Sequence, residues 1–261
     1  MDADLNMIHV EHLTKTFEDL RRGEIRAVDD VSFDAYGGEI FGLLGPNGAG
    51  KTTTLRILST VLGPTAGRAV VAGHDVVAEP ESVRRRIGFV SMNTGMYDRM
   101  SAYEMVAYFG QLHGMAPDVL NERIEVIFDR LQMNDFRDRM GGKLSTGMKQ
   151  KVSLARAIVH DPKVLIFDEP TTGLDVLVSR AVLDFIASCR QADRCVIFST
   201  HIMHEAQRLC DRICVIHRGS VLVNDTLAAL RESTGKQSLE DIFFDMVSEE
   251  DIRAAVQGGK R

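Results

Sequence analysis

The first 90 residues carry apolar and polar positions with the short periods that strands produce. Apolar and polar residues alternate from Ile8 to Leu13 and, more loosely, from Ala27 to Phe33. Ile40 to Leu44 is a mainly apolar run flanked by glycine, as expected for a strand that is buried on both faces. The pair Gly37-Gly38 indicates a turn before it. This part of the chain is therefore predicted to form short strands joined by turns.

From about residue 95 the period becomes helical. Ser101 and Glu104 have the spacing of a capping box, in which each side chain accepts from a backbone N–H of the other. Apolar residues then recur at i, i+3, i+4 and i+7 and, after Pro117, at helical spacing again: Met105, Tyr108, Phe109 and Leu112, then Leu120, Ile124, Ile127, Phe128 and Leu131. A stretch that holds only helices between strand-forming regions predicts a helical subdomain over about 93–158.

Strand-like runs return at 163–168, 195–200 and 213–217, and Leu174 to Ala187 has the pattern of a crossover helix between two of them. Strands that alternate with helices predict a parallel sheet in an α/β fold. Near the end, Ser238 precedes an apolar stripe that predicts one more helix. The stripe contains Leu239, Ile242, Phe243, Met246 and Val247.

Composition excludes several classes of protein. With 261 residues, 44% hydrophobic and 26% charged, the chain is not a disordered protein, a collagen or a coiled coil. The net charge of −6 does not favour a nucleic-acid partner. The four cysteines are Cys189, Cys195, Cys210 and Cys214, and they form no CxxC pair. They are expected to be reduced thiols in packed elements, which implies the cytosol.

No apolar run reaches the roughly 20 residues that a transmembrane helix needs. The N-terminus, Met1-Asp2-Ala3-Asp4, lacks the basic and apolar regions of a signal peptide. If the protein works at a membrane, another chain is expected to supply the membrane-spanning part.

The segment from Gly45 to Thr52 matches GxxxxGK[ST], the P-loop pattern, and it lies between a predicted strand and the helical residues Thr53 to Leu58. Glycines let successive backbone N–H groups point inward at phosphate oxygens, and the following helix adds its positive end. Lys51 is suited to the β- and γ-phosphates, and the hydroxyl of Thr52 is suited to Mg²⁺. The sequence therefore predicts a site for a nucleoside triphosphate.

Two adjacent acids, Asp168 and Glu169, follow the buried apolar run from Val164 to Phe167. Carboxylates at the end of a buried strand are costly unless they have partners, and Mg²⁺ and a nucleophilic water are suitable partners. Asp168 is predicted to hold the metal as a Walker B acid, and Glu169 to orient and polarise the attacking water.

With the segment from Leu144 to Gln150, the sequence resembles the ATP-binding cassette (ABC) ATPases. The segment, LSTGMKQ, is similar to the LSGGQ signature of that family, with Thr146 and Met148 in place of Gly and Gln. Ser145 and Gly147, the functional core of the signature, are both present. They open a helix that provides a second phosphate-binding terminus. The signature also lies one helix before the acids, as the family requires.

Other family elements follow in the expected order. The resemblance implies that Phe17 stacks on adenine, although an ordinary core or surface phenylalanine is also consistent with the sequence. Gly173-Leu174-Asp175 is similar to the D-loop, and His201 to the switch histidine that contacts the γ-phosphate. The resemblance then implies catalytic roles for Lys51, Glu169 and His201 and a Mg²⁺ site at Thr52 and Asp168. The nucleotide-binding set is Phe17, Gly45, Asn47, Gly48, Ala49, Gly50, Lys51, Thr52, Thr53, Ser145, Gly147 and Asp175.

The resemblance covers residues 7 to about 230 and implies a P-loop NTPase (RecA-like) core, an antiparallel β subdomain and the helical signature subdomain. One ABC ATPase domain is expected over 1–261, with the core and β subdomain at about 1–92 and 159–230. The remaining residues, about 231–261, form a C-terminal helix and tail. The family also implies a head-to-tail dimer, taken here as a homodimer, with each ATP between the P-loop of one subunit and the signature of the other.

One position departs from the family, because Met92 stands where the Q-loop glutamine is expected, with Asn93 beside it. Methionine is a poor Mg²⁺ ligand. The stretch from Met92 to Met100 and the ending from Ser238 to Phe243 resemble the sodium-export (NatA-like) branch of type-two ABC exporters. Met96, Tyr97 and Met100 would give the 92–103 region a soft apolar groove for a permease helix, although they are also consistent with ordinary core residues.

The leading hypothesis is therefore an ATPase subunit that drives an exporter from the cytoplasmic face of the membrane. A non-transport ABC ATPase acting on ribosomes or DNA is an alternative, as is a P-loop kinase. The signature, the two acids and His201 argue against a kinase. His201, His204 and Glu205 also resemble part of a zinc helix, but no third ligand with supporting spacing accompanies them.

Overall fold

The computed structural model describes residues 6–19, 23–91 and 95–258. Ten named strands form two sheets: β1 (Asn6–Asp19), β2 (Gly23–Tyr36), β3 (Ile40–Leu44), β4 (Ala66–Val71), β5 (His74–Asp75), β6 (Ile87–Ser91), β7 (Val164–Asp168), β8 (Cys195–Thr200), β9 (Arg212–His217) and β10 (Ser220–Thr226). The antiparallel sheet has the order β2-β1-β4-β5. The larger sheet has the order β10-β9-β3-β8-β7-β6 and is parallel except for β10.

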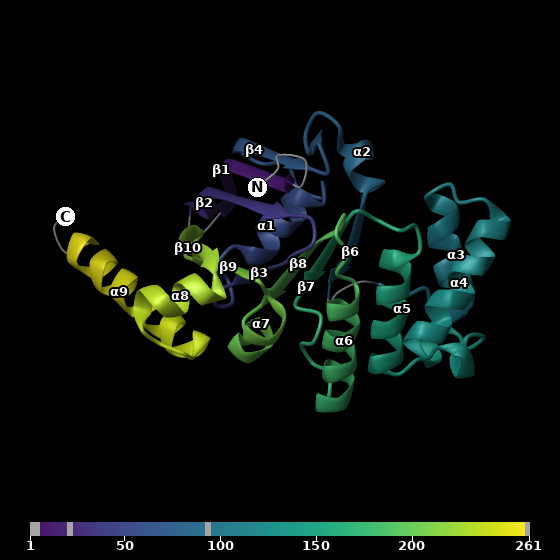
Figure 1. Ribbon diagram of the computed structural model, residues 1–261. Coiled ribbons are helices and arrows are strands. Elements are labelled where there is room, and N and C mark those ends of the chain that lie inside the picture. The colour runs from purple at the N-terminus through teal and green to yellow at the C-terminus, as the bar shows by residue number, and fades with distance from the viewer. Residues whose placement is uncertain (1–5, 20–22, 92–94, 259–261) are drawn as a thin grey trace.

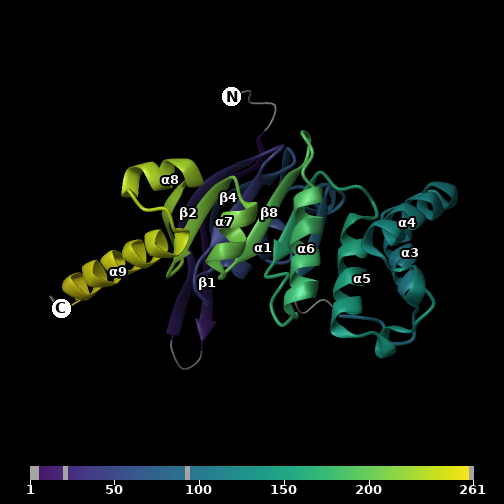
Figure 2. The ribbon, with the colours of Figure 1, turned by 60° about the horizontal axis from the view of Figure 1, so that its bottom comes forward.

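The α-helices are α1 (Lys51–Leu58), α2 (Pro80–Arg84), α3 (Ala102–Leu112), α4 (Pro117–Leu131), α5 (Thr146–Ile158), α6 (Val176–Ser188), α7 (Met203–Leu209), α8 (Leu227–Thr234) and α9 (Leu239–Gly258). Helices α3, α4 and α5 pack together beside the β6 edge of the larger sheet (Figure 1). Helices α8 and α9 lie at the opposite side of the molecule, and α9 points away from its body (Figures 1 and 2).

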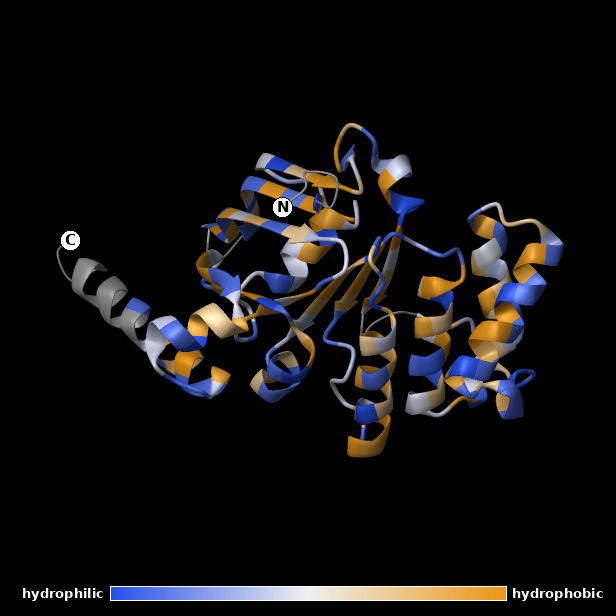
Figure 3. Ribbon diagram, in the orientation of Figure 1, coloured by the Kyte–Doolittle hydropathy of each residue, from blue (hydrophilic) through white to orange (hydrophobic). Residues whose placement is uncertain are grey.

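The central strands β3, β7 and β8 are mainly hydrophobic (Figure 3) and buried along their length, because both faces of the sheet are covered. Along β7, Leu165 and Phe167 pack in one hydrophobic cluster with the helices α3 to α7, whereas Val164 and Ile166 pack in a second cluster with β1, β2 and α1. Alternate side chains of a strand point to opposite faces, so the sheet separates these two cores. The prediction that β3 is buried on both faces is confirmed, since all five of its residues are buried.

Several local predictions are confirmed in detail. Ser101 caps α3 by accepting from the backbone N–H of Glu104 at 3.1 Å, and the Glu104 carboxylate accepts in return from the N–H of Ser101 at 2.7 Å. The helix expected after Ser238 begins at Leu239. The four cysteines are all free and buried.

Other local predictions were wrong. The first 90 residues are not only short strands, because β1 and β2 are 14 residues long each and the unpredicted helix α2 also lies there. The helix predicted after the P-loop is confirmed, since α1 contains Thr53 to Leu58. Two long strands pair with each other over a full hairpin, so their extent depends on a partner that the alternation does not show. The crossover helix begins at Val176 and not at Leu174, because the side chain of Asp175 caps it.

Candidate active site

The P-loop connects the end of β3 to the start of α1. Gly48 and Gly50 have φ angles of 81° and 109°, in the left-handed region that glycine adopts without strain. Gly45 needs to be glycine for another reason, since a Cβ there would lie 2.1 Å from the carbonyl oxygen of Ile216 on β9. The loop is therefore held against the sheet, and its shape depends on these glycines.

Lys51 is the first residue of α1, and only 4% of its side chain is exposed. Its Nζ donates to the carbonyl oxygens of Gly45 at 2.7 Å and Pro46 at 3.1 Å and lies 3.4 Å from Oε1 of Glu169. Burial lowers the pKa of Lys51, and the carboxylate of Glu169 opposes that change. Phosphate oxygens are charged and accept hydrogen bonds from an ammonium more strongly than neutral carbonyl oxygens do, so a bound phosphate would replace these carbonyl partners.

The P-loop borders a cavity of about 280 Å³. Its lining consists of Ala27, Asn47, Gly48, Ala49, Gly50, Lys51, Thr52, Thr53 and Glu169. The seven residues from Asn47 to Thr53 are consecutive in the sequence. Glu169 follows β7 and lies more than a hundred positions after them. Ala27 on β2 was not predicted, because nothing in its sequence surroundings distinguishes it from other alanines.

Asp168 and Thr52 bring two oxygen ligands together beside this cavity. Oγ1 of Thr52 donates to Oδ1 of Asp168 at 3.2 Å. Burial raises the pKa of Asp168, and the hydrogen bond from Thr52 opposes that rise. A buried carboxylate next to a hydroxyl offers the hard oxygen ligands that Mg²⁺ prefers. The residues present thus fit a magnesium ion.

Glu169 is held in place by two further side chains. Its Oε2 accepts a hydrogen bond from Oγ1 of Thr172 at 3.1 Å and one from Nδ1 of His201 at 3.0 Å. Burial alone would raise the pKa of Glu169, but the bond from His201 and the charge of Lys51 outweigh burial and lower it. The carboxylate is therefore kept ionised, which is the state that a base needs. Thr172 was not predicted, although it lies three residues after Glu169.

The signature residues lie elsewhere. Ser145 caps α5 by accepting from the backbone N–H of Met148 at 3.3 Å. Gly147 lies against α6, where an added Cβ would be 3.2 Å from Val178. Neither residue lines the P-loop cavity of the same chain. Gln150 does connect the two regions, because its Nε2 donates to the carbonyl oxygen of Pro170 at 2.8 Å.

Asp175 and Phe17 also lie outside the P-loop cavity. Asp175 accepts from the backbone N–H groups of Leu177 and Val178, both at 3.0 Å. Phe17 is on β1, is 39% exposed, and has Nζ of Lys15 5.3 Å from its ring centroid. The structure therefore gathers the predicted P-loop, Walker B and switch residues, but not the signature, Asp175 or Phe17. Met92 and Asn93 lie outside the described residues.

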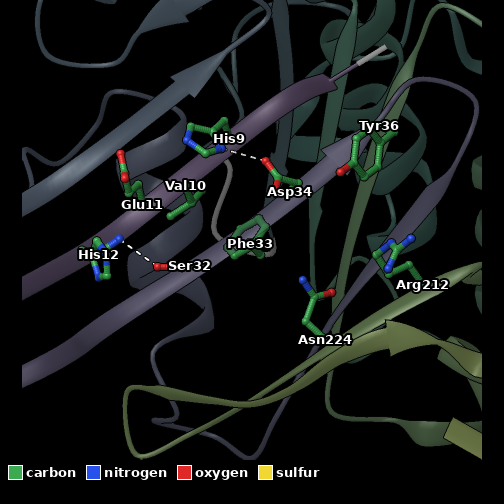
Figure 4. Close-up of a pocket in the computed structure, with 10 residues that line it drawn as sticks. All are labelled: His9, Val10, Glu11, His12, Ser32, Phe33, Asp34, Tyr36, Arg212 and Asn224. Atoms are coloured by element: carbon green, nitrogen blue, oxygen red, sulfur yellow. Dashed lines mark hydrogen bonds and ion pairs between the residues drawn. The ribbon is translucent and has the colours of Figure 1, made fainter. Parts of the chain in front are cut away.

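Two other features do not form a second catalytic centre. No group of three or more His, Cys, Asp or Glu side chains in the described part of the chain could hold a metal ion. A larger cavity of about 520 Å³ lies between β1, β2, β9 and β10 (Figure 4). Its polar groups are already partly paired, since His9 contacts Asp34 and His12 contacts Asp30, each at 2.7 Å.

None of the described helices is long and apolar enough to cross a membrane.

Comparisons with known proteins give consistent results. The profile of the family described as ABC transporter matches residues 28–172. The ABC transporter ATP-binding protein NatA of Bacillus subtilis (strain 168) is 42% identical over 239 residues, which are 91% of this chain and 97% of NatA. The doxorubicin resistance ATP-binding protein DrrA of Mycobacterium tuberculosis is 37% identical over 90% of this chain and 71% of its own length. The Nod factor export ATP-binding protein I of Burkholderia lata is 37% identical over 82% and 70%.

Solved structures show the same fold. An ATP-binding subunit of an ABC transporter superposes with a TM-score of 0.83 and 26% identity, covering 92% of this chain and 99% of that one. A dimeric ATP-binding cassette in a post-hydrolysis state, bound to ADP and Pi, superposes with a TM-score of 0.76 and 24% identity, covering 84% and 98%.

Proposed function

The chain belongs to the ABC transporter family as an ATP-binding and ATP-hydrolysing subunit, and from this premise we propose that two copies drive export through a separate membrane permease. The observation that carries the proposal is that Lys51 and Glu169 meet at the P-loop cavity while Asp168 contacts Thr52 beside it. Lys51 comes from α1, and the two acids come from the end of β7. An ammonium suits phosphate binding, one carboxylate suits a metal ion, and the other suits the activation of water.

Each residue has a distinct task at the triphosphate. The backbone N–H groups of the P-loop and the start of α1 bind phosphate oxygens. Lys51 neutralises charge on the β- and γ-phosphates while Glu169 orients the attacking water and accepts its proton. His201 keeps Glu169 in position through the 3.0 Å contact. It is also proposed to contact the γ-phosphate, as the switch histidine of the family does.

Thr52 and Asp168 would hold Mg²⁺, since their oxygens already lie 3.2 Å apart. When bound, the ion would withdraw charge from the β- and γ-phosphates. Removing Mg²⁺ with a chelator should therefore abolish hydrolysis and leave the fold intact.

A dimer is supported by the position of the signature. Ser145 and Gly147 do not line the P-loop cavity of their own chain, so a second subunit is needed to bring a signature to the nucleotide. Val176 and Leu177, directly after Asp175, are 84% and 80% exposed. Two neighbouring apolar side chains with so much exposed surface are typical of an interface. Two head-to-tail copies would cover them beside each nucleotide.

The permease is proposed to dock at the 92–103 region. The described part of this region contains Tyr97, which is 50% exposed, and Met96 and Met100, which are partly buried against the core. Arg156 on α5 donates to the carbonyl oxygen of Gly95 at 3.0 Å and also borders a cavity of about 270 Å³. The rings that line this cavity are those of Phe89 on β6, Phe109 on α3, and His113 and His160, which follow α3 and α5. An apolar groove between the sheet and the helical subdomain suits an amphipathic helix.

With this docking, the subunit would work at the cytoplasmic face of the membrane as a peripheral protein. The chain is proposed to be one ABC ATPase domain over 1–261, with the core and β subdomain at about 1–92 and 159–230, the helical subdomain at about 93–158 and the C-terminal part at about 231–261. The packing of α3, α4 and α5 with one another supports this division.

The proposal is tested by purifying the tagged chain from detergent-solubilised membranes and identifying its partners by mass spectrometry. We expect a multi-span permease to co-purify and Mg²⁺-dependent ATP hydrolysis in the eluate. The variant Tyr97→Asp should lose the permease but still bind ATP. Val126→Asp is the matched control, because Val126 is 60% exposed on α4 and outside the docking region.

Enrichment of ribosomal proteins or DNA in place of a permease would favour the non-transport alternative. Transfer of the γ-phosphate to an acceptor other than water would favour a kinase. Retention of the permease by Tyr97→Asp would contradict the docking region while leaving the ATPase assignment intact.

A further inference from the structure

Glu205 is a buried carboxylate that the proposed hydrolysis does not use directly. It lies on α7, four residues after His201, and is only 3% exposed. Within the described part of the chain, no lysine or arginine forms an ion pair with it. Burying a carboxylate is unfavourable unless hydrogen bonds compensate, so the partners of Glu205 indicate its role.

Those partners are two buried threonines from different segments. Oε2 of Glu205 accepts from Oγ1 of Thr171 at 2.9 Å and from Oγ1 of Thr200 at 3.2 Å. Thr200 is the last residue of β8, whereas Thr171 follows the end of β7. Thr200 Oγ1 also accepts from the backbone N–H of Ile202 at 3.0 Å, which leaves its own proton for Glu205. One carboxylate therefore ties the two loops together.

Each threonine is the chain neighbour of a residue that holds Glu169. Thr172 follows Thr171, His201 follows Thr200, and both contact Oε2 of Glu169 at 3.1 Å and 3.0 Å. Glu169 itself has a φ of 51°, a left-handed conformation that is strained for a residue with a side chain. Such a conformation persists only where the surroundings fix it, and the two loops supply those surroundings.

We propose that Glu205 is a positioning residue for ATP hydrolysis, which clamps the segment after Glu169 to the segment before His201. The inference rests on the proposed role of Glu169 and His201 at the nucleotide. A carboxylate suits this task because it only accepts, so both hydroxyls can donate to it at once. Without it, Thr172 and His201 could shift relative to each other, and the carboxylate of Glu169 would lose its fixed direction.

The first test compares Glu205→Ala with Glu205→Gln in the purified dimer. Gln keeps the shape and one acceptor oxygen, so it should retain at least about a third of the wild-type kcat. Ala removes the clamp and should lower kcat by about 10-fold or more, because small displacements of a reacting group are costly. The KM for ATP and the dissociation constant for nucleotide should change by less than about 3-fold in both variants.

The second test removes one donor at a time. Thr171→Val and Thr200→Val keep the side-chain shape and should each lower kcat several-fold, again with little change in nucleotide affinity. Thr234→Val is the matched control, since Thr234 lies on α8 and donates to the carbonyl oxygen of Leu230. If Glu205→Ala does not fold, the two threonine variants still test the positioning role of Glu205.

The third test asks whether Glu205 acts through Glu169. In single-turnover measurements, adding Glu205→Ala to a Glu169→Gln protein should cause no further loss, because residues that act as one unit are not additive. Equal losses in both backgrounds, or a wild-type kcat in all four single variants, would overturn the inference. If the wild-type chain itself does not hydrolyse ATP, the proposed function fails instead, so the two failures are distinguishable.

Discussion

The buried Lys51 forms an ion pair with the partly buried Glu169 at the P-loop cavity, with Nζ and Oε1 3.4 Å apart. The pair connects the ammonium of Lys51, proposed to bind phosphate, to the carboxylate of Glu169, proposed to activate water. Each affects the other, because the charge of Lys51 helps to lower the pKa of Glu169, and Glu169 limits the fall in the pKa of Lys51. Substitutions at the two positions should nevertheless have different consequences, since only Lys51 is expected to bind the nucleotide.

For Glu169→Gln we expect ATP binding to be retained and hydrolysis to slow by at least about 10²-fold, the usual loss for a positioned base. The dimer that ATP closes should then persist. Phosphate release and light scattering after size-exclusion chromatography measure the two effects. Unchanged turnover would remove Glu169 from its role.

For Lys51→Ala we expect ATP binding and hydrolysis to weaken together. Loss of charge-assisted hydrogen bonds to phosphate should reduce affinity by about 10- to 100-fold. Binding of a fluorescent ATP analogue measures this. Lys163→Ala is the control, because Lys163 is half exposed and pairs with Asp193. Normal ATP binding by Lys51→Ala would count against the phosphate site.

The sequence predicts those features that depend on local pattern. The strand β3, the P-loop glycines, the capping box at Ser101 and the adjacent acids Asp168 and Glu169 all carry their signal in a few consecutive residues. The comparisons then confirm the family that these motifs indicate.

What the sequence does not predict depends on contacts between distant segments. Glu205 follows His201 and His204 closely enough to resemble part of a zinc helix, yet the structure turns it towards Thr171 and Thr200 in the core. Nothing in the spacing shows that these threonines come together, because β7 and β8 become neighbours only in the folded sheet. The length of β1 and β2 is not predicted either, because it depends on the pairing of the two strands with each other.

For Leu177→Asp we expect the nucleotide-driven dimer to weaken by at least about 10-fold. A charge would replace one of the apolar side chains proposed to be covered at the subunit seam, and a buried unpaired charge costs several kcal/mol. The substitution is made in the Glu169→Gln protein, and the dimer is followed by light scattering with ATP. Val126→Asp should leave the dimer unchanged. If the Leu177→Asp dimer is as stable as the dimer without this substitution, Leu177 is not part of the subunit interface.

The last prediction concerns stability in acid and arises from two stacked imidazoles. The rings of His113, after α3, and His160, after α5, lie 3.5 Å apart and nearly parallel. His160 Nε2 lies 3.0 Å from the carbonyl oxygen of Ile87 on β6, so this pair joins the helical subdomain to the sheet. Burial and the neighbouring His113 lower the pKa of His160 to about 4. Burial lowers the pKa of His113 as well.

A histidine whose pKa is lower in the folded state takes up its proton in the unfolded chain first, so stability rises with pH in that range. His160 should thus contribute full stability above about pH 6.5, with up to about 3 kcal/mol lost as the pH falls to about 4. Urea unfolding at pH 8, 6.5 and 5 measures this slope. His160→Gln should flatten the slope, whereas the exposed His204→Gln should not. An unchanged slope in His160→Gln would mean that other groups cause the acid sensitivity, because Gln cannot take up the proton that the imidazole does.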